Sequence, residues 1–405
     1  SQRHGVQART RAVASDARYR AMSGELPFAG LRVVAVEQAV SGPFCTRQFA
    51  DLGAEVIKIE RPKGGDFARG YDGALHGMSA YFAWLNRGKR SVVLDLKTSD
   101  ARERLRAMIV GADVFVHNLA PGAIERMGLG YDELSSLAPR LIWVGISGYG
   151  PDGPYRDKKA YDMLIQAESG VVAVTGTPNE PAKVGVSIAD IASGLYAYSS
   201  ATAALYRRER TGRGERIDIS MFECMTEWMM PPLYSLIGTG KTPVRAGLRH
   251  NMIVPYGAYK CADGEVLFAI QSDREFRRFC ETVLDDVSLA DDSDYSVNSA
   301  RLAHRQALEE IIGDTLGKLS VLEAVERLEA GGIANAVVND VRGVASHPQL
   351  GARERWTTVE SYVGAVPALI PPHNLASSPA QMGRIPALGE NTDDDFSTGD
   401  SRAPR

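Results

Sequence analysis

Cysteines, basic clusters and long apolar stretches are all scarce in this chain of 405 residues. The four cysteines are scattered, with no C-x-x-C pair and no Cys/His group at zinc-ligand spacing, so we expect no bound metal and a reducing compartment. Lys and Arg number 46 against 50 Asp and Glu, which leaves no basic excess for a nucleic-acid backbone. No apolar run approaches the roughly 20 residues that span a bilayer, so we expect no membrane anchor.

The first 26 residues are rich in arginine and poor in acids, a composition that resembles a transit peptide. Met22 offers a natural start, so we expect residues 1–26 to be a foreign or disordered extension outside the fold. The expected location is the cytoplasm, or the mitochondrial matrix if the extension is a transit segment.

From residue 31 onward, apolar runs alternate with segments that favour helix. The runs are almost continuously apolar, which is typical of strands covered on both faces in a parallel sheet. We therefore predict an α/β fold whose large domain is a Rossmann-like, doubly wound parallel sheet. The expected strands are residues 31–37, 54–60, 90–96, 112–118 and 140–147, with a first helix at 41–53.

Later segments indicate a long helix and a second, smaller domain. Residues 189–212 are rich in Ala, Ser and Gly and predict a helix that packs closely against a neighbour. Residues 256–270 predict a β-hairpin around the Asp263-Gly264 turn, in a small α+β domain. We expect the last fifteen residues to fray. The expected ranges are 27–225 for the large domain, 226–330 for the small domain with linkers, and 331–405 for a segment that returns to the large domain.

The usual nucleotide fingerprint is absent from the first strand-to-helix turn, where residues 38–43 read QAVSGP. A G-x-G-x-x-G match does occur at residues 148–153, but Pro151 and Pro154 disfavour the helix that must begin inside such a motif. A nicotinamide site is therefore disfavoured, and any nucleotide must bind to this sheet in another way.

Three polar residues near the first strands have alternative interpretations. Ser41 precedes a helix and is typical of an N-cap. Glu60 ends the second strand, where a ribose-binding acid would stand in a dinucleotide site. Arg61 beside it is equally suited to a phosphate.

Several long motifs then occur in one order: SGPFCTRQFADLGAEVIKIERPKGGD, NRGKRSVVLDLK, ADVFVHNLAPGAIERMGLGYDEL, GYGPDGPY, AYDMLIQAESGVVAVTG, SIADIASG and LGENTDD. Together they resemble the family III CoA-transferases, the CaiB/BaiF group of the formyl-CoA and carnitine CoA-transferase type. The resemblance covers the chain from Leu31 to about Asn391.

The resemblance implies that Asp190 is a nucleophile. Its carboxylate would attack a thioester to form a mixed anhydride and then an aspartyl-CoA thioester, which splits one acyl exchange into easier steps. Tyr161 and Asp162 fall where relatives place active-site residues. Racemases of the same fold carry a His-Asp pair there, and tyrosine is a poor base at neutral pH, so a racemase-type isomerase is the weaker alternative. A protein that binds CoA without catalysis is disfavoured because Asp190 is present.

Coenzyme A or an acyl-CoA is expected as substrate, with no permanently bound cofactor. Its phosphates require guanidinium or ammonium partners. The residues that the resemblance assigns to CoA are Gln38, Ala39, Val40, Arg61, Leu94, Lys97, Asn118, Leu119, Ala123, Arg126, Met127 and Lys159.

The second substrate is expected to be a dicarboxylic acid. Arg249, His250 and Asn251 make a polar, cationic loop, which resembles the transferases that handle succinate and glutarate. The expected reaction moves CoA from succinyl-CoA, or a related dicarboxylyl-CoA, to itaconate, mesaconate, citramalate, glutarate or a similar acid. The resemblance also implies an interlocked homodimer.

Overall fold

The protein, seen in a computed structural model, is described over residues 26–396 and divides into two compact units. Unit 1 contains residues up to 169, residues 184–229 and residues from 352 onward. Unit 2 contains residues 170–183 and 230–351. Within residues 26–396, no helix is both long and apolar enough to cross a lipid bilayer.

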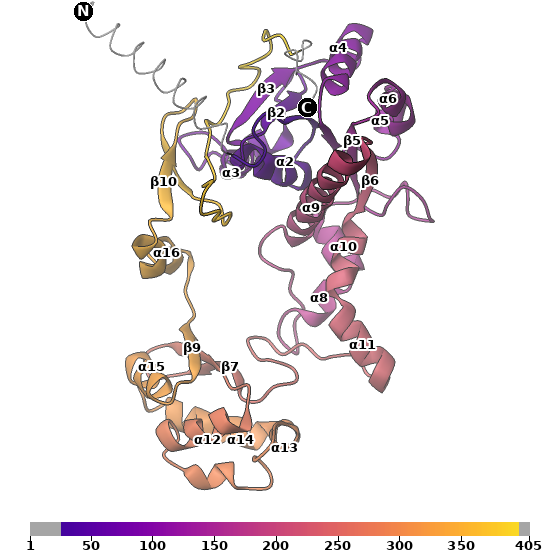
Figure 1. Cartoon of the computed structure of the whole chain (residues 1–405). Helices are drawn as coiled ribbons and strands as arrows, with labels where there is room; N and C mark the ends of the chain where they lie inside the picture. Colours follow the sequence, from indigo (N-terminus) through magenta and orange to yellow (C-terminus); the bar gives the residue numbers. More distant parts are fainter. Residues whose placement is uncertain (1–25, 397–405) are drawn as a thin grey trace, which may run out of the picture. The chain divides into compact units, whose positions relative to one another are not determined.

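Unit 1 is built on a six-stranded parallel sheet with the order β3-β2-β1-β4-β5-β6 (Figure 1). This confirms the α/β fold and the parallel sheet that the apolar runs predict. The order reverses between β1 and β4, which is where open α/β sheets usually bind their ligands. The strands are β1 (Arg32–Val36), β2 (Glu55–Glu60), β3 (Lys89–Val93), β4 (Val114–His117), β5 (Ile142–Ser147) and β6 (Glu215–Ser220).

Helices cover both faces of this sheet. On one face, α4 (Ser99–Val110) and α6 (Tyr131–Leu137) pack apolar residues against alternate strand positions such as Val34 and Phe115. On the other face, α2 (Ser41–Asp51) lies against α9 (Ile188–Thr211) (Figure 1).

The remaining elements of unit 1 are shorter. They are η1 (Phe67–Gly70), α3 (Ala80–Asn86), α5 (Ala123–Arg126), α7 (Asp162–Glu168), α10 (Met221–Trp228), β10 (Trp356–Val359) and β11 (Val366–Leu369). The last two strands form an antiparallel hairpin.

The C-terminal segment covers the β3 edge of the sheet. Asn391 exchanges two hydrogen bonds with Ser91, at 2.9 and 3.2 Å, and Thr392 Oγ1 accepts from the N–H of Val93 at 2.9 Å. The Phe396 side chain is only 3% exposed in the core under α4. The expectation that the chain frays from residue 391 is therefore wrong as far as residue 396, because these contacts satisfy an otherwise open strand edge.

Unit 2 contains a three-stranded antiparallel sheet, β7-β8-β9, packed with helices around a core that includes Phe268, Phe276 and Phe279. The pairing of β7 with β8 confirms the predicted hairpin. Its elements are α8 (Val171–Val174), α11 (Met230–Thr239), β7 (Tyr256–Lys260), β8 (Glu265–Ala269), α12 (Asp273–Thr282), η2 (Val287–Ala290), α13 (Asn298–Ala303), α14 (Arg305–Leu316), α15 (Val321–Ala330), β9 (Ala334–Val337), α16 (Val341–Ala345) and α17 (Pro348–Ala352), which reaches the boundary.

Helices α2 and α9 touch at Gly194. A Cβ atom there would lie 2.5 Å from the carbonyl oxygen of Ser41 and 3.2 Å from the Phe44 side chain. The small residues of α9 therefore do allow the close packing that the sequence predicts, and they bring the first turn of α9 beside the first turn of α2.

Gly194→Ala should force these helices apart and lower the free energy of unfolding by about 1–3 kcal/mol, the usual range for overpacking. Gly313→Ala in α14 is the matched control, because a Cβ there meets no atom within 4 Å. That control should stabilise by about 0.5–1 kcal/mol. Urea unfolding of both variants measures whether each substitution lowers or raises the free energy of unfolding. A Gly194→Ala protein as stable as the parent would contradict the close packing of the two helices.

Candidate active site

Two of the predicted catalytic residues, Asp162 and Asp190, meet at the N-terminus of α9. Asp162 Oδ1 accepts hydrogen bonds from the backbone N–H groups of Ala189, at 2.8 Å, and Asp190, at 3.2 Å. Its Oδ2 accepts a hydrogen bond from Gln166 Nε2 at 2.7 Å. Asp162 thus caps α9 from the neighbouring helix α7, and both carboxylates lie at the end of α9 where the helix dipole favours negative charge. Tyr161 precedes them and is 73% exposed.

The Asp190 carboxyl is held in a poorly solvated position. Burial, and then the neighbouring charge of Asp162, raise its pKa from 3.8 to about 7, while a hydrogen bond from the Ser41 hydroxyl acts in the opposite direction. The pKa is raised because water stabilises the charge of a buried carboxylate less well. Carboxyl groups with a pKa near neutral pH are typical of functional sites.

Ser41 is a site residue that the sequence did not identify. The N-cap position of α2 is Val40, without a side-chain cap, so the N-cap role predicted for Ser41 is wrong. Asn118 Nδ2 donates a hydrogen bond to Ser41 Oγ at 3.0 Å, which leaves the Ser41 proton available to the Asp190 carboxyl. The only signal in the sequence is a hydroxyl residue directly after a strand-to-helix turn.

A cavity of about 300 Å³ lies at the carboxyl ends of β1, β2 and β3 in unit 1. It collects six of the twelve residues expected to bind CoA: Gln38, Arg61, Leu94, Lys97, Leu119 and Met127. Arg61 and Lys97 are exposed cations at this cavity, as phosphate binding requires.

The other six expected CoA residues lie around the cavity or beyond it. Ala39 and Val40 continue the turn after β1, and Val40 is only 3% exposed, so its side chain belongs to the core. Asn118 holds the turn by hydrogen bonds to both the N–H and the carbonyl of Gln38, at 2.9 and 2.8 Å. None of these six residues lines the cavity itself; the last three are Ala123 and Arg126 in α5 and the exposed Lys159.

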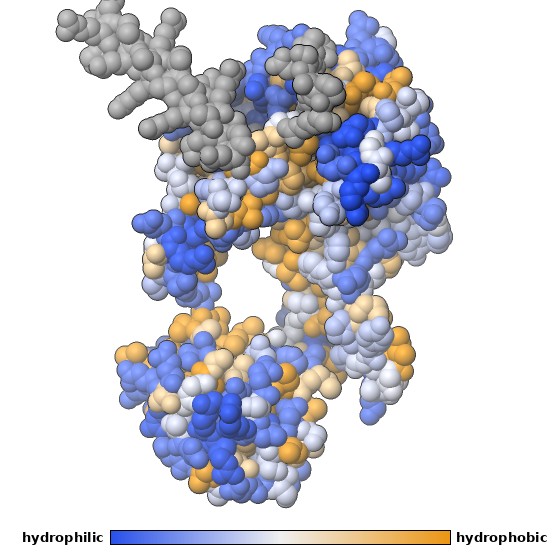
Figure 2. Space-filling model, viewed as in Figure 1, coloured by the Kyte–Doolittle hydropathy of each residue, from blue (hydrophilic) through white to orange (hydrophobic). Residues whose placement is uncertain are grey.

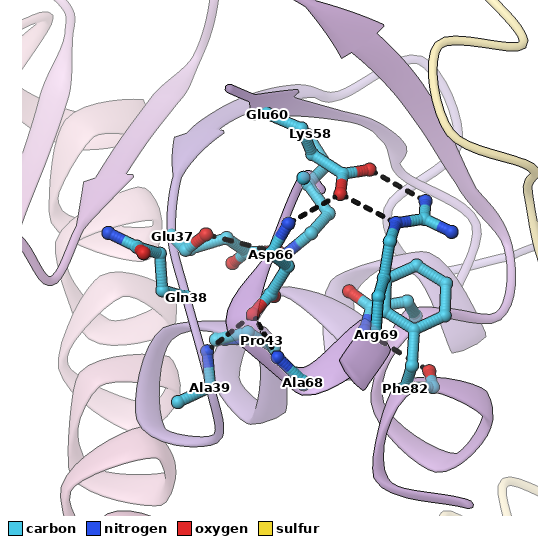
Figure 3. A network of polar contacts seen from close by, with 12 residues as sticks. Glu37, Gln38, Ala39, Pro43, Lys58, Glu60, Asp66, Ala68, Arg69 and Phe82 are labelled. Carbon is cyan, nitrogen blue, oxygen red and sulfur yellow. Dashed lines mark hydrogen bonds and ion pairs between the residues drawn. The ribbon is translucent and has the colours of Figure 1, made fainter. Parts of the chain in front are cut away.

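A buried network of charges lies beside this turn (Figure 3). Lys58 in β2 is fully buried, and its ammonium lies 2.7 Å from Asp66 Oδ2 and 3.3 Å from Glu37 Oε1. Lys89 in β3 is bound by the same Glu37 oxygen at 2.7 Å and by the carbonyl of Pro43 at 3.1 Å. A lysine inside an apolar strand is the sequence signal for such a pair, since a buried charge requires a partner.

Glu60 belongs to this network through its protein partners. Arg69 contacts both of its carboxylate oxygens, at 2.7 and 2.8 Å, and Ser91 donates a hydrogen bond at 2.6 Å. Although burial opposes ionisation, the hydrogen bond from Arg69 and the charge of Lys58 lower the pKa of Glu60 to about 2. Of the two alternatives, these contacts favour a structural role for Glu60 over that of a ribose-binding acid, because its oxygens already accept hydrogen bonds from protein.

The motif at residues 148–153 is followed by turns and an irregular segment, and α7 begins only at Asp162. No helix opens inside the motif, which confirms that it is not a dinucleotide fingerprint.

Unit 2 holds the predicted acid-binding segment Arg249, His250 and Asn251. The Arg249 guanidinium lies 3.3 Å from Glu309 and 4.1 Å from the Tyr259 ring centroid. Arg305 shares Glu309 at 3.5 Å and donates hydrogen bonds to the carbonyls of His250 and Asn251. Two guanidiniums on one carboxylate leave this cluster with a net charge of +1.

The residues from 28 to 392 match the model of CoA-transferase family III. The chain belongs to this family. It is 34% identical over 376 residues to the succinate–glutarate CoA-transferase of Agrobacterium fabrum, covering 90% of this chain and 94% of that one. It is 36% identical over 329 residues to the acetyl-CoA:oxalate CoA-transferase of Acetobacter aceti, covering 81% and 84%.

The crystal structure of a CaiB/BaiF family protein from Brucella suis superposes with a TM-score of 0.80 at 34% identity, covering 91% of this chain and 98% of that one. The family resemblance read from the motifs is therefore confirmed. This CoA-transferase uses CoA thioesters as substrates.

The Asp190 environment gives the transferase a testable pH dependence. Between pH 4 and pH 7 the unfolded chain loses the Asp190 proton while the folded protein keeps it, so this residue makes the fold less stable as pH rises. Asp190→Asn removes this loss of stability, because asparagine does not ionise. Its melting temperature relative to the parent should therefore rise from pH 4 to pH 7 and stay constant above. Asp152→Asn, at an exposed carboxylate, is the control; a difference independent of pH for Asp190→Asn would contradict the burial of its charge.

Proposed function

We propose that this CoA-transferase moves CoA from succinyl-CoA, or a related dicarboxylyl-CoA, to a carboxylic acid such as itaconate, mesaconate, citramalate or glutarate, with Asp190 as the nucleophile. The observation that carries the proposal is the position of Asp190, a half-buried carboxylate at a helix N-terminus with the Ser41 hydroxyl beside it. Such a carboxylate is desolvated and held in place, as a nucleophile requires.

The reaction would pass through two mixed anhydrides with an aspartyl-CoA thioester between them. Asp190 attacks the donor thioester, expels the CoA thiolate and forms a mixed anhydride; the thiolate then attacks the Asp190 carbonyl and releases the donor acid. The acceptor carboxylate then attacks this aspartyl thioester, expels the CoA thiolate and forms the second mixed anhydride. The thiolate finally attacks the acceptor carbonyl of this anhydride, which gives the new acyl-CoA and releases the Asp190 carboxylate.

Ser41 and Asp162 have different roles in this scheme. The Ser41 hydroxyl donates to an Asp190 oxygen, and such a donor stabilises the oxyanion that develops when a thiolate adds to the Asp190 carbonyl. Asp162 fixes the first turn of α9 through Ala189 and Asp190, so it positions the nucleophile. Tyr161 lies directly before Asp162, and we place it at the mouth of this site because its side chain is exposed.

CoA itself would bind to the cavity at the carboxyl ends of β1 to β3. Arg61 and Lys97 supply cations for its phosphates, and Leu94, Leu119 and Met127 supply an apolar surface for the adenine. The turn of Gln38, Ala39 and Val40, with Asn118 beside it, leads from this cavity to Ser41. We place Ala123, Arg126 and Lys159 at the outer part of the same site.

The covalent step can be tested by isotope transfer. When succinate labelled with ¹⁸O in its carboxylates serves as acceptor, each turnover should transfer one labelled oxygen to Asp190, while one of its own oxygens leaves with the donor acid. The Asp190 peptide should therefore gain about 2 Da after one turnover and approach a gain of about 4 Da after many, and Asp190→Ala should lose at least 99% of the activity while it still binds CoA. An unlabelled peptide after many turnovers, or a tenth of the activity in Asp190→Ala, would refute the assignment.

The second carboxylate of the acceptor would bind to the cationic segment of unit 2. An entering carboxylate loses water and needs a compensating donor or charge. Arg249, His250 and Asn251 are assigned this role, with Arg305 supplying the charge that Glu309 does not neutralise.

Replacing Arg249 and His250 together by Ala should raise the KM for succinate by roughly 10-fold or more, the scale of one charge-assisted hydrogen bond at about 1.5–3 kcal/mol. The KM for acetate and the affinity for CoA should not change. Arg274→Ala, at an exposed arginine of the same unit, is the control. Equal losses for acetate and succinate would show that the segment does not bind the second carboxylate.

The proposed functional unit is an interlocked homodimer. Helix α11 supports it, because none of its residues is buried and Leu233, Tyr234 and Ile237 are 37%, 66% and 74% exposed. Figure 2 shows orange residues on the surface at the place where Figure 1 labels α11. An apolar helix surface of this kind is typical of a protein interface.

Sedimentation should give a native mass of about twice the 43.8 kDa of one chain. The mass should not change on dilution, because interlocked chains cannot separate without unfolding. A monomer that appears on dilution would contradict the interlocked arrangement.

A further inference from the structure

The turn between β1 and α2 has an unfavourable backbone conformation at its centre. Ala39 has a φ of 60°, in the left-handed region that residues with a Cβ atom rarely adopt. Such a conformation persists only where surrounding contacts impose it. The turn carries three of the residues assigned to CoA, so its backbone conformation determines part of the proposed CoA-binding surface.

The Asp66 carboxylate supplies the contact that fixes Ala39 (Figure 3). Its Oδ1 accepts the backbone N–H of Ala39 at 2.9 Å and that of Ala68 at 2.9 Å. Its Oδ2 lies 2.7 Å from the Lys58 ammonium. Asp66 itself is 2% exposed, and its own N–H donates to Glu60 Oε2 at 2.9 Å.

The two Asp66 oxygens therefore accept from donors on opposite sides. An ionised carboxylate can do this because both of its oxygens are acceptors. An amide has one acceptor oxygen, so asparagine at this position would turn its NH₂ group toward either Lys58 or the Ala39 N–H. Only an acid satisfies the buried lysine and the turn together.

We propose that Asp66 is a positioning residue for CoA binding, whose carboxylate holds the turn at Ala39 in the conformation that receives CoA. The inference rests on the CoA site assigned under the proposed function, and it does not depend on Asp190 as the nucleophile.

Charge alone predicts the opposite effect. Asp66 lines the cavity where the CoA phosphates are placed, so its negative charge repels the ligand. If charge decided, Asp66→Asn would bind CoA more tightly. If Asp66 positions the turn, Asp66→Asn binds CoA more weakly, and the sign of the change separates the two cases.

The experiment measures the Kd of free CoA by isothermal titration calorimetry in the full-length protein. Asp66→Asn should raise the Kd at least 10-fold. Asp95→Asn is the matched control, because it removes a carboxylate from the same cavity. Among the described hydrogen bonds, the Asp95 carboxylate accepts only the N–H of Lys97. This control should not raise the Kd. An equal or lower Kd for Asp66→Asn overturns the proposal.

A rescue variant tests the role of the backbone. Glycine adopts positive φ without a steric penalty, so Ala39→Gly should make the turn less dependent on Asp66. In the Ala39→Gly background, Asp66→Asn should raise the Kd less than threefold. The same 10-fold rise in both backgrounds would show that Asp66 acts by another route, and this too overturns the proposal.

If circular dichroism shows that Asp66→Asn does not fold, Ala39→Val tests instead whether the conformation of the turn controls CoA binding. A branched side chain disfavours positive φ further and leaves the charge network intact. It should raise the Kd at least threefold, and an unchanged Kd overturns the proposal. Because free CoA binds without any acyl transfer, a failure of the Asp190 mechanism in the isotope experiment would leave these results valid.

Discussion

The buried pairing of Lys58 with Asp66 and Glu37 is the interaction on which the rest of unit 1 depends. It joins β2, the end of β1 and the loop after β2 through side chains that are fully buried, and Lys89 extends it to β3 and the first turn of α2. Removing one partner from such a network leaves an uncompensated charge, which typically costs about 3–5 kcal/mol. The carboxyl ends of three strands are therefore fixed relative to one another before any substrate binds, and a preorganised site loses less entropy on binding.

The second constraint is the close approach of α9 to α2 at Gly194. Because these helices nearly touch, the first turn of α9 brings Asp190 to Ser41, which directly follows the turn beside the buried network. The same closeness reduces the solvation of Asp190, which together with the charge of Asp162 raises its pKa. The packing of small residues and the chemistry of the carboxylate thus have one cause.

Much of this architecture could be predicted from the sequence because it depends on local patterns. Continuous apolar runs predict the parallel strands, and the small residues of 189–212 predict a closely packed helix. The partners of the charged residues could not be predicted in this way. Lys89 meets Glu37, 52 positions away, and Arg249 meets Glu309, 60 positions away, and no local pattern encodes such pairs. The role of Glu60 stayed open for the same reason, since its hydrogen bonds from Arg69 and Ser91 are visible only in three dimensions.

The turn after β1 connects the two faces of the sheet. The proposed CoA cavity includes Val36, Ile59 and Leu94, whose side chains belong to the core on the α4 side, whereas Asp190 lies on α9 across the sheet. Residues 38–41 form the short path between them, with Gln38 at the cavity and Ser41 at Asp190. A ligand with its phosphates at one end and its thioester at the end of a long arm has the shape that such a path requires. In the proposed mode of binding, a rigid turn fixes how tightly the nucleotide end binds and where the thioester arrives. The conformation of Ala39 would therefore affect substrate binding although its methyl group performs no chemistry.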